Sequence, residues 1–380
     1  MSSTNLKISF GMIVLNGEPF VKYCLQGVYD FAHEIIIVEG AVENARHLAS
    51  PEGRSVDGTV ETILNFPDPE NKIKLIQKKG FWKEKDEQAN AYMEVCTGDY
   101  IWQLDADEFY RRDDIKRIFQ LLSTKEIQAV SFKMYSFWGG FNAYAVGGRM
   151  EEHVRRIHKY EPGYRYLTHR PPTVLNFQGQ SLNDLNALSA DQTAQMGIFL
   201  YHYSYVFPDQ VKTKVTYYSK MWKYLEGLEW YEKCWLKLGN PLMTHPDKRF
   251  ASWLELFNGE HPDVIQQLIF DLNQRKEPFD KLSIRDESDI FELLNSPEYP
   301  RIIQKGKVQN RTFQAYNSGI RGYYIQSLKY LIAAIRLDKS NVLTWLNLLT
   351  FPRFVFLTIL RMGKNLIRKL LLRWSKGDAK

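Results

Sequence analysis

The sequence predicts an α/β protein in which helices flank a mostly parallel, mixed sheet. Short apolar runs rich in β-branched residues occur at 8–15, 34–39, 73–77 and 100–104. Segments of helical length separate these runs, and this alternation is typical of the right-handed crossovers of a parallel sheet. After residue 205 the pattern becomes helical and rich in aromatic residues. We therefore expect a helical extension to follow the α/β part.

The first crossovers can be followed residue by residue. An Asn-Gly-Glu-Pro turn at 16–19 ends the first strand, and Pro19 suits the first turn of a helix over 20–31. Further helices are expected over 59–66 and 86–95. In sheets of this kind, ligands bind beyond the carboxyl ends of the strands. The residues that directly follow the second and fourth strands are therefore candidates for a binding site.

The rest of the chain divides into fewer clear elements. A helix is expected over 115–122, and strands over 129–137 and 153–159 with a glycine-rich loop at 139–148 between them. Later helices are predicted over 211–225, 230–238 and 264–272, followed by a helical pair at 320–337 and 341–349. We therefore predict three parts: an α/β domain (1–205), a helical extension (206–350) and a basic tail (351–380).

Composition indicates a globular protein, and the distribution of charge argues against one class of partner. The apolar fraction of 44% and the charged fraction of 25% are ordinary for a globular protein. The net charge is +6, but residues 353–380 carry eight Lys or Arg and one Asp, so the rest of the chain is close to neutral. A nucleic-acid-binding protein more often spreads positive charge over a folded face. We therefore predict no nucleic-acid partner.

The termini and the cysteines indicate the compartment. Cys24, Cys96 and Cys234 are far apart and odd in number, which favours neither a disulfide framework nor a zinc site and fits a reducing environment. Residues 1–7 are polar and lack the pattern of a secretory signal. The predicted location is the cytoplasm.

Three acidic residues follow the fourth predicted strand. Asp105, Asp107 and Glu108 come directly after the apolar run at 100–104. Carboxylates cannot be buried without a cation or a proton, and Mg²⁺ and Mn²⁺ prefer oxygen ligands. The turn therefore predicts a metal site for a phosphorylated substrate. A solvated, helix-capping acidic turn would have the same composition.

Four short motifs occur in order along the first part of the chain. They are the Asn-Gly-Glu turn that ends 12–18, Val-Glu-Gly at 38–40 followed after an insertion by Ser-Val-Asp-Gly-Thr at 55–59, Lys-Asp-Glu-Gln-Ala-Asn at 85–90, and Asp-Ala-Asp-Glu at 105–108. Together they resemble the nucleotide-sugar glycosyltransferases of the GT-A fold, in particular the large inverting family 2. The resemblance covers residues 7 to 205 and leaves out the helical extension.

The resemblance implies a GT-A fold and an activity. The protein would transfer a hexose from a nucleoside-diphosphate sugar to a glycan or a lipid-linked acceptor with inversion, as in polysaccharide biosynthesis. Mn²⁺ or Mg²⁺ would stabilise the negative charge on the leaving diphosphate. By resemblance Asp107 is the direct metal ligand, Asp105 contacts the ribose or the metal through water, and His202 completes the site. The alternative for His202 is a core histidine packed among the tyrosines of 199–205.

The resemblance also implies which residues contact the donor. Glu39 would accept hydrogen bonds from a ribose or base hydroxyl, and Lys85 would approach a phosphate as a point charge. The ordinary alternatives are an exposed glutamate at a strand end and a surface lysine. The full set of predicted nucleotide-sugar contacts is Asn16, Glu39, Asp57, Lys85, Asn90 and Asp105.

The base that would take the acceptor's proton is not identified by the sequence. Relatives often place a His-Glu pair after the strand at 153–159, whereas here His169 is followed by Arg170. The remaining candidates for the base are His169, Glu151, Glu152, Asp184 and Asp191. Arg155 and Arg156 could hold a phosphate or an acidic acceptor, although neighbouring residues of a strand point to opposite faces.

The tail has the pattern of an amphipathic helix. Over 354–374 a helix would place Arg361, Lys364, Arg368 and Lys369 on one face and apolar residues on the other. Such a helix can lie on an anionic membrane surface, here the inner face of the membrane, but its charges prevent it from spanning a bilayer. The alternative is a terminal helix packed on the body of the protein.

Two other classes of function remain open. The first is a non-catalytic sugar-nucleotide-binding or scaffold protein, favoured by the arginine in place of the acid beside His169. The second is a metal-dependent nucleotidyltransferase, whose acidic residues would also hold a divalent ion.

Overall fold

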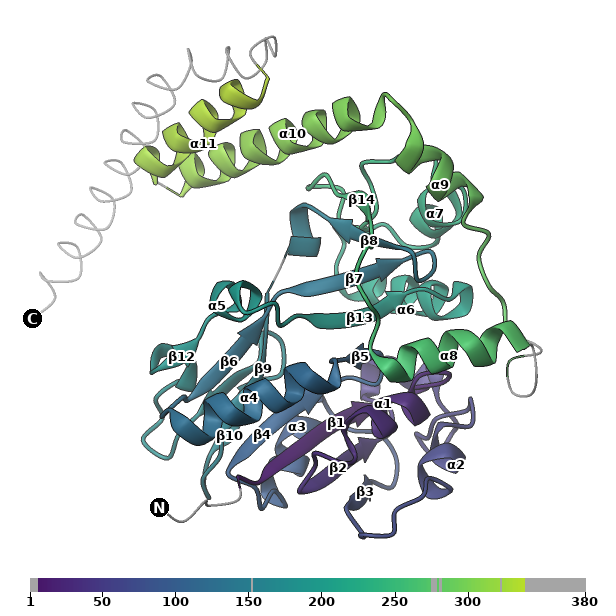
Figure 1. Cartoon of the computed structure of the whole chain (residues 1–380), viewed down its shortest axis with the longest axis vertical. Coiled ribbons are helices and arrows are strands. Elements are labelled where there is room, and N and C mark those ends of the chain that lie inside the picture. The colour runs from purple at the N-terminus through teal and green to yellow at the C-terminus, as the bar shows by residue number, and fades with distance from the viewer. Residues whose placement is uncertain (1–5, 152, 275–278, 280–281, 322, 339–380) are drawn as a thin grey trace, which may run out of the picture. The chain divides into compact units, whose positions relative to one another are not determined.

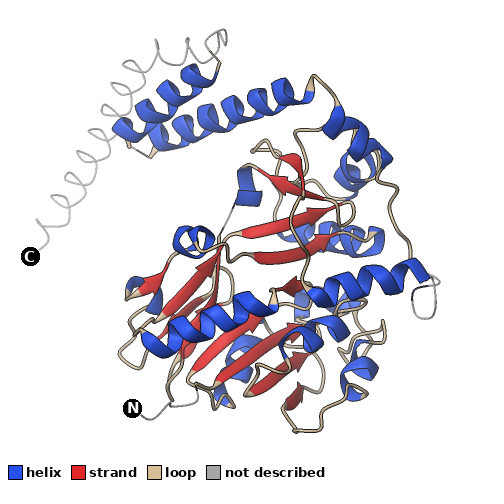
Figure 2. Ribbon diagram, viewed as in Figure 1, coloured by secondary structure: helices blue, strands red, loops and turns tan. Residues whose placement is uncertain are grey.

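The structure is a computed structural model of the 380-residue chain, and it describes residues 6–151, 153–274, 279, 282–321 and 323–338. The chain forms two compact units (Figures 1 and 2). The first unit consists of Met1–Tyr144, Glu151–Tyr217 and Leu256–Asp286, and the second of Ala145–Met150, Tyr218–Glu255 and Glu287–Lys380. The first unit thus includes residues from both sides of position 205.

A seven-stranded sheet forms the centre of the first unit, in the order β12-β6-β9-β4-β1-β2-β3. Strand β1 pairs in parallel with β2 and β4, and β2 pairs in parallel with β3, whereas β9 runs antiparallel to β4 and β6. These strands are β1 (Ile8–Val14), β2 (Glu34–Glu39), β3 (Ile73–Gln77), β4 (Tyr100–Leu104), β6 (Ala129–Phe132), β9 (Val154–Lys159) and β12 (Ala187–Leu188). The predicted α/β class with a mostly parallel, mixed sheet is confirmed.

The helices of the first unit cover both faces of this sheet (Figure 1). Alternate residues of β1 and β4, including Phe10 and Trp102, join the larger hydrophobic core with α1 and α4. On the other face, Ile101 packs with α3 and with the hairpin formed by β10 and β11. These elements are α1 (Val21–Val28), α2 (Thr59–Leu64), α3 (Lys85–Glu94), α4 (Arg112–Thr124), α5 (Ala190–Gln195), α6 (Pro208–Met221), α8 (Asp263–Gln274), β10 (Arg165–Thr168) and β11 (Thr173–Leu175).

One close approach explains a glycine in β1. A Cβ atom on Gly11 would lie 2.8 Å from a ring carbon of Tyr92 in α3. Any larger residue at this position would therefore push α3 away from the sheet.

The apolar run at 129–137 is not one strand, as predicted, but two. Residues 129–132 form β6 in the central sheet, whereas β7 (Met134–Trp138) pairs in parallel with β13 (Leu200–Tyr205). Lys133 separates the two strands, and its ammonium group binds Asp191 at 2.6 Å in solvent. β13 also pairs antiparallel with β5 (Glu108–Phe109). The predicted glycine-rich loop contains a further strand, β8 (Ala143–Val146).

The second unit is mainly helical. Its long helices are α9 (Ser288–Asn295), α10 (Tyr299–Ile320) and α11 (Tyr324–Leu337). The hydroxyl group of Tyr299 donates to Leu254 O at 2.8 Å, and the Asn310 amide bonds both backbone groups of Ala251. These bonds fix α10 beside β14 (Trp253–Leu256). Shorter elements of the chain are α7 (Leu228–Trp230), η1 (Glu43–Leu48), η2 (Gly148–Glu151), η3 (Leu182–Asp184) and the π-helix η4 (Tyr231–Trp235).

The first helix of the predicted helical pair is present as α11. Helix α11 packs against α10, which precedes it, and the predicted partner at 341–349 lies outside the described residues. The predicted amphipathic helix at 354–374 also lies outside them. None of the helices in the described part of the chain has both the length and the apolar character needed to cross a bilayer.

Candidate functional site

The acidic turn joins the central sheet to strands β5 and β13, which also lie in the first unit. Strand β4 ends at Leu104, and the turn closes with a hydrogen bond from Glu108 N to Asp105 O at 3.0 Å. The chain then enters β5, in which Glu108 pairs with His202 of β13. A bond from Tyr203 N to Asp107 O at 2.9 Å adds to this pairing. The pairing brings His202 to the turn although it lies almost one hundred residues further along the chain.

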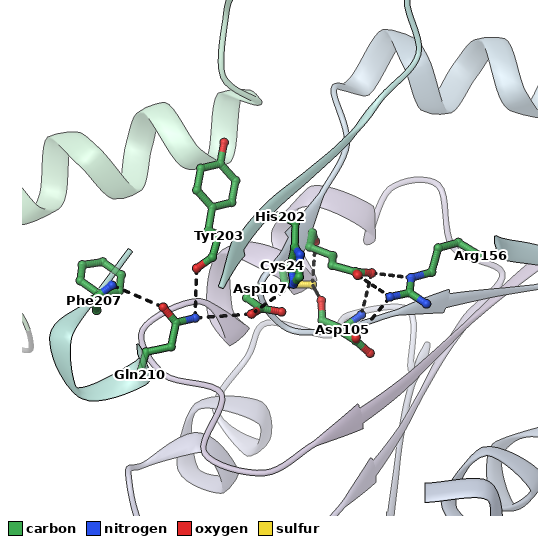
Figure 3. A network of polar contacts seen from close by, with 9 residues as sticks. Cys24, Asp105, Asp107, Arg156, His202, Tyr203, Phe207 and Gln210 are labelled. Atoms are coloured by element: carbon green, nitrogen blue, oxygen red, sulfur yellow. Dashed lines mark hydrogen bonds and ion pairs between the residues drawn. The ribbon is translucent and has the colours of Figure 1, made fainter. Parts of the chain in front are cut away.

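Asp107 and His202 face each other (Figure 3). His202 Nε2 lies 3.6 Å from Asp107 Oδ2, and the side chains are 16% and 23% exposed, respectively. Gln210 of α6 donates from Nε2 to the same carboxylate at 3.4 Å and to Tyr203 O at 3.0 Å. Burial raises the pKa of Asp107, but His202 and Lys214 outweigh this effect and hold the pKa below its ordinary value. The carboxylate is therefore ionised and accessible.

Asp105 has a different partner. Arg156 of β9 is 4% exposed, and its Nη2 lies 3.3 Å from Asp105 Oδ2. Arg156 also donates from Nε to Glu108 Oε2 at 2.7 Å, and from Nη2 to Glu108 Oε1. Burial raises the pKa of Asp105, but Arg156, His169, Lys85 and Arg170 together lower it well below its usual range.

The prediction that Arg156 contacts a phosphate or an acceptor needs correction. Its Nε and Nη2 atoms are used by two protein carboxylates, because β9 runs antiparallel beside β4 and turns this side chain towards the acidic turn. Arg155 is half-buried, and β9 has an irregular register with β6 beside it. Arg156 therefore neutralises the acidic turn from inside the protein.

The residues at the ends of β1 and β2 hold a loop in place. Asn16 has a left-handed φ of 54°; its Nδ2 donates to Leu48 O at 2.7 Å and its Oδ1 accepts from Val56 N at 2.8 Å. Asp57 accepts from Glu18 N at 2.9 Å and from both the N–H and the hydroxyl group of Thr59. The predicted ligand contacts Asn16 and Asp57 thus bind the protein's own backbone.

Glu39 differs from both sequence-based expectations, since it is neither exposed nor open to a ligand. Its side chain is fully buried, and it accepts hydrogen bonds from Ser55 N at 2.7 Å and Gln77 Nε2 at 2.9 Å. Arg54 completes its environment at 3.4 Å. The insertion between residues 40 and 55 folds back and covers the carboxylate.

Helix α3 and strand β10 form the other side of the site. Asn90 joins them, because its amide bonds both the N–H and the C=O of Tyr166. Asp86 Oδ1 accepts from His169 N at 2.6 Å, and His169 Nδ1 lies 3.4 Å from Gln103 Nε2. Burial lowers the pKa of His169 to about 3, and Asp105 offsets this only in part. His169, Lys85 and Asp105 are thus brought together, whereas Asn90 has a structural role.

Part of this chain is similar to a known protein family. The model described as "Glycosyl transferase family 2" matches residues 52–182. This segment belongs to glycosyl transferase family 2. It contains Asp105, Asp107, Arg156 and His169, whereas His202 lies outside it.

Individual relatives cover less of the chain. The SPbeta prophage-derived glycosyltransferase SunS of Bacillus subtilis is 29% identical over 125 residues, which are 32% of this chain and 25% of SunS. The glycosyltransferase SunS of Bacillus phage SPbeta matches equally. The chain thus spans about a quarter of the length of these curated relatives.

Two solved structures show a distant likeness. S. aureus TarS has a TM-score of 0.27 at 17% identity, over 34% of this chain and 22% of TarS. Glucosyl-3-phosphoglycerate synthase from Mycobacterium tuberculosis, solved with Mn²⁺, UDP and glucosyl-3-phosphoglycerate, has a TM-score of 0.26 at 16% identity, over 34% of this chain and 44% of the synthase.

The donor atoms near the family 2 turn fit a divalent ion. Asp107 and His202 place one carboxylate oxygen and one imidazole nitrogen 3.6 Å apart, and both side chains are partly exposed. Mn²⁺ accepts imidazole, and Mg²⁺ is commonly held by one or two carboxylates together with water and substrate phosphates. Within the described ranges, no group of three His, Cys, Asp or Glu side chains is ready to hold a metal.

One predicted catalytic residue, Asp191, is not brought to this site. Asp191 lies on α5, where its 76% exposed side chain pairs with Lys133, so its proposed role as the base needs correction. Glu152 lies outside the described residues. The sequence analysis missed Gln210, for which no local signal exists, and Gln103, whose polar side chain in a fully buried strand was a usable signal.

Proposed function

We propose that this protein is a metal-dependent glycosyltransferase that takes its sugar from a nucleoside-diphosphate donor. The observation that carries the proposal is the pair formed by Asp107 Oδ2 and His202 Nε2, 3.6 Å apart, directly after the family 2 strand β4. A divalent ion held by this pair would supply positive charge to the leaving diphosphate.

The side chains around Asp105 also support the binding of a nucleoside-diphosphate donor. Lys85, Arg156 and Arg170 place positive charge around Asp105, and such charge raises the local concentration of an anionic ligand. Arg156 keeps Asp105 ionised, so that this carboxylate can accept a hydrogen bond from a ribose hydroxyl or from a metal-bound water. Transfer to a glycan or a lipid-linked acceptor, with inversion, completes the proposal on the strength of the family resemblance.

A thermal-shift screen of nucleotide sugars tests the donor and the metal together. We expect one donor to raise the melting temperature only when Mn²⁺ or Mg²⁺ is present, since the metal bridges protein and diphosphate. Release of nucleoside diphosphate over a panel of acceptors then measures transfer. Equal stabilisation with and without metal for every donor would contradict the metal-dependent site.

The same assays separate the rival functions. Arg170 stands where relatives often have an acid, and this favours a non-catalytic sugar-nucleotide-binding or scaffold protein. Such a protein would bind a donor without turnover on any acceptor. A nucleotidyltransferase would instead release pyrophosphate from a nucleoside triphosphate.

We further propose a cytoplasmic protein that contacts the inner face of the membrane through residues 354–374. The eight Lys or Arg of residues 353–380 favour an anionic surface. A chain truncated after Pro352 should lose binding to vesicles that contain anionic lipid, measured by cosedimentation. Neutral vesicles serve as the control, and undiminished binding of the truncated chain to the anionic ones would show that the tail is not the membrane contact.

A further inference from the structure

A buried chain of hydrogen bonds leads from Tyr166 through Gln103 to His169. All three residues lie in the first unit and are at most 5% exposed. The Tyr166 hydroxyl group donates to Gln103 Oε1 at 3.3 Å. At the other end of the same amide, Gln103 Nε2 lies 3.4 Å from His169 Nδ1. The amide of Gln103 therefore connects a hydroxyl donor to one nitrogen of the imidazole.

The direction of this chain determines where the imidazole carries its proton. A carboxamide has one accepting end and one donating end. Because Tyr166 donates to Oε1, the NH₂ group of Gln103 faces His169, and Nδ1 must accept. A neutral imidazole whose Nδ1 accepts carries its hydrogen on Nε2. The backbone bond from His169 N to Asp86 Oδ1, at 2.6 Å, fixes the position of this residue.

The charges around His169 indicate what Nε2–H would bind. Asp105 is the strongest charge that acts on this ring, and Lys85, Arg156 and Arg170 act on both the ring and Asp105. Cationic neighbours disfavour a second proton on the ring and attract an anion. Asp105 is already bound by Arg156, and in the described part of the chain no hydrogen bond to a protein atom is recorded for His169 Nε2.

We propose that His169 is a hydrogen-bond donor, through Nε2–H, to a phosphate oxygen of the nucleotide-sugar donor, and is not the base that deprotonates the acceptor. Gln103 is the positioning residue that selects this tautomer. The assignment of the phosphate rests on the proposed function, whereas the tautomer does not. The donor hydrogen bond would strengthen as negative charge develops on the leaving diphosphate.

The tautomer can be measured without any substrate. In the full-length protein with ¹³C- and ¹⁵N-labelled histidine, the His169 ring signals are assigned by their loss in His169→Gln. We expect the chemical shifts of an Nε2–H tautomer, and an Nδ1–H tautomer would overturn the proposal. Gln103→Glu should switch the tautomer to Nδ1–H, because a carboxylate accepts from Nδ1–H. If this buried variant does not fold, Tyr166→Phe, which removes the hydroxyl group that orients the amide, should give a mixture.

The role of His169 as a hydrogen-bond donor is tested by a pair of substitutions at this position. Glutamine can place an amide N–H near the position of Nε2 but cannot act as a base. We expect His169→Ala to reduce kcat/KM by about 10²-fold, as for the loss of one preorganised donor, and His169→Gln to retain most of the activity. Equal losses in both variants would contradict the donor role.

His33 provides a matched control, because it lies at the amino end of β2 and the candidate site lies at the carboxyl ends of the strands. His33 precedes β2 and contacts Thr97 at 3.0 Å, so His33→Gln should leave turnover unchanged. The tautomer measurement and the turnover assay also distinguish the proposed function from the proposed role of His169. An Nε2–H tautomer in a protein without turnover would refute the proposed function, whereas turnover with an Nδ1–H tautomer would refute only this inference.

Discussion

Replacing Asp107 by alanine is expected to lower nucleotide-sugar turnover by about a thousandfold, because the carboxylate is the only anionic member of the proposed metal pair. The fold should be retained, since the side chain is 23% exposed and is not an internal ion-pair partner of Arg156. Initial rates of nucleoside-diphosphate release measure the effect. The metal-dependent thermal shift should disappear in the same variant.

A second aspartate serves as the control for this substitution. Asp113 at the start of α4 is 85% exposed and pairs with Lys116 at 2.9 Å, so Asp113→Ala removes an equal charge away from the site. It should leave turnover and the metal-dependent shift unchanged. If Asp107→Ala behaved like Asp113→Ala, the metal assignment would be wrong.

Replacing Arg156 by methionine is expected to reduce the free energy of unfolding by about 3–5 kcal/mol. Glu108 has no exposed side-chain surface, and without Arg156 its charge would be buried without a cation. The cost arises from the carboxylate that is left behind and not from the loss of the pair itself. Urea unfolding followed by tryptophan fluorescence measures the change.

A double substitution distinguishes this cause from a simple loss of packing. Arg156→Met combined with Glu108→Gln removes both charges, and we expect it to recover more than half of the lost stability. Arg155→Met, one residue away and only half-buried, should change the stability by less than about 1 kcal/mol. If the double variant were as unstable as Arg156→Met, uncompensated charge would not be the reason.

Much of the central sheet could be predicted from the sequence. Strands β2, β3 and β4 have the predicted bounds, because turn residues delimit each apolar run. The run at 129–137 was misread as one strand, since both of its halves are apolar and only their partners in two different sheets separate them. For the same reason β5 could not be predicted: its two residues form a strand only beside β13.

The candidate site was likewise predictable only in part from the sequence. The position of Asp105 and Asp107 after a buried strand follows from local pattern, whereas Arg156 was assigned to a ligand and in fact binds Glu108 and Asp105. The sequence did not reveal that the insertion after residue 40 covers Glu39, because the composition of a polar loop does not indicate which residues it covers.

The sequence by itself therefore determined the α/β class, the strand that ends in the acidic turn and the family to which this part of the chain belongs. The class and the strand depend on short apolar runs that turn residues delimit, and the family resemblance depends on short motifs, all of which are local properties. Only the tertiary structure decided which acid pairs with His202, which acid is neutralised by Arg156, and which nitrogen of His169 faces Gln103. Each of these depends on strands that meet across long stretches of chain, and a charge or a hydrogen-bond donor acts only on the groups that the fold places within a few ångströms of it.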